Sequence, residues 1–118
     1  MAQVNLRIYS PRWGHHDTYS VELHRDYLRI IMAPREALAT WVENSDPVWS
    51  GESLLRIMNN DSIYPPEITE RLFQRAWLAW RGGEIDDEQV EHELQLVADW
   101  INAVTESKPN SDFWRAYF

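Results

Sequence analysis

The sequence predicts an α+β fold in which a small antiparallel meander of two to three strands is followed by, and packs against, three to four α-helices. Apolar and polar residues alternate in the first third of the chain, a pattern typical of half-buried strands. In the remainder, apolar residues recur at helical spacing. The length of 118 residues matches one domain that buries about two thirds of its surface. We therefore expect a single domain.

The strands are expected within residues 3–32. Residues 4–9 (VNLRIY) alternate between apolar and polar side chains, and residues 18–24 (TYSVELH) alternate in the same way. Residues 27–32 (YLRIIM) fit either a third strand or the lead into a helix.

The helical part is expected within residues 34–107. Pro34 suits the first position of a helix, and residues 35–44 (REALATWVEN) place Leu, Trp and Val on one side. Ser50 is a candidate N-cap for a short second helix that carries four apolar residues.

Two longer helices follow. The first begins at Pro66 and ends at the glycine pair 82–83. The second begins at Asp86, which forms an approximate capping box with Gln89, and its apolar residues repeat at spacings of four and three. It ends near Ser107, ahead of a proline.

The overall composition excludes whole classes of protein. Cysteine is absent, which removes disulfides, cysteine-ligated metals and thiol nucleophiles. No apolar run approaches 18 residues, and the first ten residues lack the features of a signal peptide, so a cytoplasmic protein with no membrane partner is predicted. A formal net charge of −8 argues against nucleic acid as a partner, because phosphate binding needs a basic surface.

The negative charge is concentrated in one segment. Between residues 84 and 106 there are eight acidic residues and no Lys or Arg, so the rest of the chain is neutral. Acidic residues at a helix N-terminus complement the helix dipole and keep the outer face soluble. The alternative is an acidic docking face for a basic partner, for which we select Glu84, Asp87, Glu88 and Glu91.

A second candidate site is the segment SPRWGHHD at residues 10–17, which is expected to be a loop between the first two strands. Histidine and aspartate side chains can bind a divalent metal or act as general bases. Neighbouring residues of an extended chain point to opposite faces, however, and no known catalytic motif is present. We therefore predict no catalytic residue, no metal and no cofactor, and expect a loop that caps the core; the candidate residues for ligand binding are Arg12, Trp13, His15, His16 and Asp17.

Seven residues are tryptophan. Trp41, Trp77, Trp80 and Trp100 fall on predicted helix faces, where we expect core positions with the indole N–H bonded to a carbonyl. The other three lie in predicted loops or near the C-terminus and could present a stacking surface to a ligand; they are Trp13, Trp49 and Trp114.

The C-terminal tail, residues 111–118, is rich in aromatic side chains. They occur as two i,i+4 pairs, which one helical turn would place on adjoining stripes. So much apolar area is expected to dock, either on the chain's own sheet or on a second subunit. A homo-oligomer, with a dimer favoured, is therefore predicted to form through Phe113, Trp114, Tyr117 and Phe118.

Two regions of the chain resemble a known group of proteins. IYSPRWGHHDTYSVEL (8–23), together with DDEQVEHELQLVADWINA (86–103) and the terminal SDFWRAY, is similar to small bacterial proteins of the kind carried on integron gene cassettes. The resemblance does not extend over residues 33–83. It implies a cytosolic accessory protein that has one domain and is often a homo-oligomer, and it implies no activity and no catalytic residue.

These observations lead to three hypotheses of function. The first is a non-enzymatic accessory protein that binds a protein partner or a small ligand as a homo-oligomer. The second is an acidic inhibitor or immunity-like protein that docks a basic partner through the helix at residues 84–106. The third is a small metal-binding protein or hydrolase that uses the segment His15-His16-Asp17.

Overall fold

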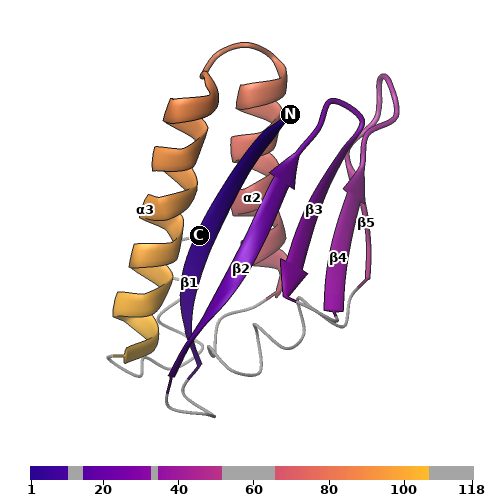
Figure 1. The fold of residues 1–118 in the computed structure, drawn as a ribbon. Coiled ribbons are helices and arrows are strands. Elements are labelled where there is room, and N and C mark those ends of the chain that lie inside the picture. The colour runs from indigo at the N-terminus through magenta and orange to yellow at the C-terminus, as the bar shows by residue number, and fades with distance from the viewer. Residues whose placement is uncertain (11–14, 33–34, 52–65, 107–118) are drawn as a thin grey trace.

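The computed structural model describes residues 1–10, 15–32, 35–51 and 66–106. Five strands precede two helices in this part of the chain (Figure 1). The elements are β1 (Ala2–Ser10), β2 (His15–Leu23), β3 (Tyr27–Met32), β4 (Arg35–Thr40), β5 (Val48–Ser50), α2 (Pro66–Arg81) and α3 (Asp87–Glu106).

The strands form one sheet in the order β1-β2-β3-β4-β5, with every neighbouring pair antiparallel. Sequential order and antiparallel pairing make the sheet a meander, as predicted. The β1–β2 pair is the most extensive, because nine residues of each strand lie opposite each other. Residues 27–32, for which two interpretations were open, form a strand.

Both helices lie on the same face of the sheet (Figure 1). Alternate residues of the first four strands turn toward these helices and are buried, whereas their neighbours lie on the opposite face. The largest fully buried side chains include Tyr19 from β2 and Phe73 and Trp77 from α2. The α+β class and the packing of the sheet against helices are thus confirmed. Neither described helix is long and apolar enough to cross a membrane.

The predicted numbers of strands and helices were wrong. The described residues contain five strands and two helices, rather than two to three strands and three to four helices. Ser50 is the last residue of β5 and donates its hydroxyl to the backbone oxygen of Leu38 at 3.3 Å, and the short helix predicted to follow it lies outside the described residues.

The first predicted helix is replaced by β4. Ala37 and Ala39 are fully buried, and the residues on either side of each face away from the core. All six residues of β4 pair with β3, and residues 38–40 also pair with β5 on the other side. The helix was predicted from Pro34 and from the spacing of Leu, Trp and Val in residues 35–44. The alanines are strong helix formers too, but their small side chains also fit the sheet face that packs into the core with the aromatic residues of α2. Pairing with β3 and β5, and not helix propensity, therefore determines that this segment is a strand.

Both longer helices were predicted correctly. After α2 the chain turns at Gly82 and Gly83, and Gly83 has a φ of 76° that favours glycine. Asp86 then caps α3: its carboxylate accepts from the Gln89 backbone N–H at 2.8 Å, and the Gln89 side chain accepts from the Asp86 N–H at 2.9 Å. These reciprocal bonds are those of a capping box.

The tryptophans predicted to lie in the core differ in their surroundings. Trp77 is fully buried and donates its indole N–H to the backbone oxygen of His24 at 2.7 Å. Trp80 is half-buried and donates instead to the carboxylate of Asp87 at 2.6 Å. Trp41 is half-buried, and the guanidinium carbon of Arg81 lies 4.4 Å from the centre of the Trp41 ring. The side chain of Trp100 lies outside the described residues.

Candidate binding surface

Four of the eight residues of the predicted histidine loop, Ser10 and His15 to Asp17, belong to strands, and residues 11–14 lie outside the described residues. β2 begins at His15, and His16 and Asp17 pair with Tyr9 and Ile8 of β1. Arg12 and Trp13 lie outside the described residues. Because side chains alternate along a strand, His16 faces away from the side on which Asp17 lies. Among the described residues no group of three or more His, Asp or Glu side chains is placed to hold a metal ion.

Trp49 was selected as a stacking surface for a ligand. The structure places it on β5, half-buried against the core. Its indole N–H donates to Oε1 of Gln74 on α2 at 3.3 Å, so it joins the sheet to the helix. Trp114 lies outside the described residues, as do the other tail residues selected for an oligomer contact.

The four acidic residues selected for a docking face lie close together at the start of α3. Glu84 lies in the turn before α3, and Asp87, Glu88 and Glu91 lie on α3; all four are exposed. Asp87 accepts the indole N–H of Trp80. In the described part of the chain, the three glutamates have no ion-pair partner.

One side of α3 is turned toward β1, the strand at the edge of the described sheet. Asn102 donates from its side-chain nitrogen to the backbone oxygen of Arg7 on β1, at 2.7 Å. Asp99, Glu91 and Glu88 precede Asn102 by 3, 11 and 14 residues, spacings that return to the same side of an α-helix. We call these three carboxylates the acidic row.

An open hollow of about 650 Å³ lies where the N-terminus meets the start of α3. Met1 and Glu88 both line it, so the first residue of the chain lies beside the start of the acidic row. Asp87 lines it too, together with the half-buried Trp80 and with Arg25 from the β2–β3 turn. The acidic row therefore begins beside the start of β1 and runs toward Arg7.

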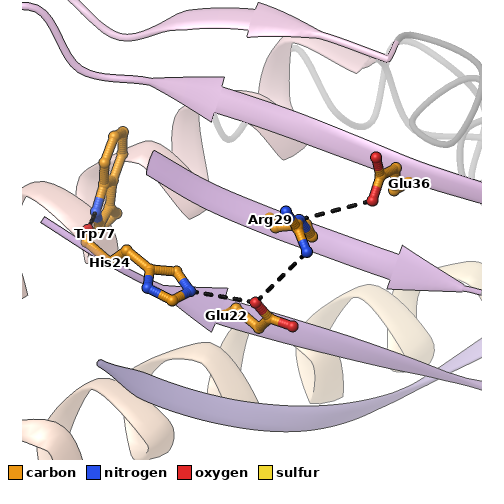
Figure 2. Close-up of polar contacts among 5 residues, drawn as sticks. All are labelled: Glu22, His24, Arg29, Glu36 and Trp77. Carbon is orange, nitrogen blue, oxygen red and sulfur yellow. Dashed lines mark hydrogen bonds and ion pairs between the residues drawn. The ribbon is translucent and has the colours of Figure 1, made fainter. Parts of the chain in front are cut away.

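A polar cluster that the sequence analysis did not identify lies on the sheet face opposite the helices. Figure 2 shows Arg29 on β3 between Glu22 on β2 and Glu36 on β4. The Arg29 guanidinium lies 3.9 Å from Glu22 and 3.6 Å from Glu36. His24 Nε2 lies 3.2 Å from the same Glu22 oxygen, and the His24 ring stacks on Tyr27 with centroids 4.1 Å apart.

This cluster depends on strand pairing. Glu22 lies directly opposite Arg29 across the β2–β3 pair, an arrangement that favours opposite charges. The alternation of residues 18–24 had already placed Glu22 and His24 on one face. Glu36 was missed because its segment was predicted to be a helix. We interpret the cluster as support for the sheet.

We expect a double-mutant cycle of Glu22→Gln and Arg29→Met to give a coupling free energy of about 0.5 kcal/mol, measured by urea unfolding. The value is small because both side chains are partly exposed and water screens their attraction. It is expected to fall further in 1 M salt. A coupling of several kcal/mol that salt does not change would contradict this interpretation.

Comparison with known proteins gives a family and a similar solved structure. A family model described as Integron cassette protein matches residues 2–105, which include the sheet and nearly all of both described helices. The chain is also similar to a solved structure of an integron cassette protein from the mobile metagenome of V. cholerae, with 64% identity, a TM-score of 0.84 and complete coverage of both chains. No curated protein matches.

Proposed function

Since this chain belongs to the integron cassette protein family, we propose that it is a non-enzymatic accessory protein that acts by binding a basic partner through the exposed acidic surface of α3. This surface includes the turn that leads into α3, and it consists of the acidic residues Glu84, Asp86, Asp87, Glu88, Glu91, Glu93 and Asp99. Homo-oligomer formation through the C-terminal tail stays a prediction.

One observation carries this proposal: every acidic residue between positions 84 and 99 is exposed, and none forms an ion pair with a described residue. From Asp86 to Glu93, successive charges lie within about 5 Å of one another along the helix axis, which is shorter than the Debye length of about 8 Å at physiological ionic strength; Asp99 lies about 9 Å beyond Glu93. Their potentials therefore add. Such a surface attracts a basic partner and orients it during encounter.

The helix dipole accounts for only part of this pattern. Asp86, Asp87 and Glu88 lie at the N-terminus of α3, where negative charge stabilises the helix. Glu91 and Asp99 lie beyond the first turn, where the dipole effect has fallen off. Their presence, without a Lys or Arg anywhere in the segment, supports a role in docking.

We expect the paired change Glu88→Lys and Glu91→Lys to weaken binding of an octalysine probe about tenfold at low salt, as measured by calorimetry. The matched control is Glu43→Lys with Asp46→Lys, two exposed acidic residues in the loop before β5. Each pair of changes brings the net charge from −8 to −4, so bulk charge is equal. Equal losses in both variants would show attraction to overall charge and would refute a docking face on α3.

A further inference from the structure

We propose that the outer edge of β1 accepts an extended, basic segment of a partner as a sixth strand, whose basic side chains meet the acidic row of α3. This rests on the proposed function, because the same face of α3 supplies the charge. It adds the backbone conformation of the partner and the place where it binds.

The edge of β1 carries backbone groups that can pair with another strand. Among the described strands β1 ends the sheet, with β2 on its other side. Because Arg7 O accepts from Asn102 on α3, the N–H and C=O of Arg7 point away from β2. Backbone direction alternates along a strand, so Gln3 and Asn5 present their N–H and C=O on the same outer side. In the part of the chain that the structure describes, Asn102 is the one residue that bonds to this side.

α3 runs along this edge in the same direction as β1 and over the same length. Met1 and Glu88 share the hollow at one end, and Arg7 and Asn102 are hydrogen-bonded near the other. The six residue steps from Met1 to Arg7 span about 20 Å of strand. The fourteen steps from Glu88 to Asn102 span about 21 Å of helix. The two lengths agree, and Figure 1 shows α3 running alongside β1.

The acidic row therefore flanks the edge over most of its length. Glu88 and Asp99 are eleven residues apart, about 16 Å along the helix. Alternate side chains of an added strand recur about every 7 Å on one face. Three basic residues at positions i, i+2 and i+4 of the partner thus fit beside the row. Strand addition of this kind draws affinity from backbone bonds and specificity from alternate side chains.

Charge also argues against a second copy of this chain at the same edge. Two β1 strands related by a two-fold axis would bring their α3 helices together, each with an acidic row toward the other. Like charges placed so close are destabilising. The side chain of Asn102 occupies the carbonyl of Arg7, which prevents further strand pairing at that residue. The partner strand therefore pairs with Gln3 and Asn5, and the bond from Asn102 to Arg7 is kept.

The first test uses a peptide of four Lys-Thr repeats and the same peptide N-methylated at every residue, so that neither edge of the extended peptide can donate. The methyl groups remove the backbone donors without changing charge. We expect the methylated peptide to bind about tenfold more weakly by calorimetry. Hydrogen exchange of the Gln3 and Asn5 amides should slow when the unmethylated peptide binds.

A second test changes the protein. Asn5→Pro removes a backbone donor on the outer edge of β1, and edge strands tolerate proline. We expect this variant to bind the unmethylated peptide about tenfold more weakly than the unchanged chain does. The control, Asn5→Ala, keeps the N–H and is expected to bind within about twofold of the unchanged chain. If Asn5→Pro does not fold, the comparison of the methylated with the unmethylated peptide on the unchanged protein tests the proposal instead.

The outcomes separate the two proposals. Equal binding of both peptides, with unchanged exchange at Gln3 and Asn5, would overturn strand addition. The proposed function would still stand provided that Glu88→Lys with Glu91→Lys weakened both peptides. Protection of Gln3 and Asn5 that grows with protein concentration, without peptide, would assign the edge to a second copy and also overturn strand addition.

Discussion

Trp77→Ala is expected to lower the free energy of unfolding by about 4 kcal/mol, within the range for truncation of a buried aromatic side chain. The indole is fully buried among side chains of the sheet and α3, and its removal leaves a large cavity. The backbone oxygen of His24 also loses its donor. Domains of this size have total stabilities of about 5–15 kcal/mol, so urea unfolding should show a greatly reduced midpoint.

Trp80→Ala is the matched control, because Trp80 is on the same helix but half-buried. Its indole bonds to an exposed carboxylate, so we expect a loss of about 1 kcal/mol. Trp77→Phe keeps a ring in the core but removes the N–H, and should fall between the two. Similar losses for Trp77→Ala and Trp80→Ala would contradict the description of Trp77 as the centre of the core.

Gly51→Ala is expected to destabilise the protein by about 3 kcal/mol in the same assay. Gly51 follows β5 with a φ of 71°, a conformation that costs an L-residue about 1–2 kcal/mol. A Cβ placed there would also lie 2.5 Å from the backbone oxygen of Glu36 and 3.0 Å from Cα of Ala37. Since both contacts are with the backbone of β4, relief requires β5 to move away from its partner.

Gly83→Ala separates the two contributions. Gly83 has a φ of 76°, almost the same as Gly51, but no atom lies within 4 Å of the added Cβ. We expect a loss of about 1 kcal/mol, from backbone strain alone. If Gly51→Ala cost no more than Gly83→Ala, the close approach of residue 51 to β4 would be disproved.

Local signals predicted the two longer helices well. Pro66 at the start, the glycine pair at 82–83 and the Asp86–Gln89 box each act within a few residues, so the sequence contains all that is needed to locate them. The first two strands were found because their alternation reflects one buried and one open face. The resemblance to integron cassette proteins, based on the two ends of the chain, is confirmed by a match that also covers the middle.

β4 shows where local signals fail. Its alanines favour a helix in isolation, and only pairing with Tyr27–Met32 on one side and Val48–Ser50 on the other makes the strand more stable. The polar cluster around Arg29 was missed for the same reason, since it requires three strands in register.

The sequence by itself determined that the negative charge resides in one segment, because composition and helical spacing are properties of the chain alone. It also determined which residues cap that helix. Only the tertiary structure determined which part of the sheet lies beside this acidic segment. The bond from Asn102 to Arg7 joins residues 95 positions apart and places the acidic row along the outer edge of β1. No local pattern encodes that contact, because it arises from packing α3 on the sheet.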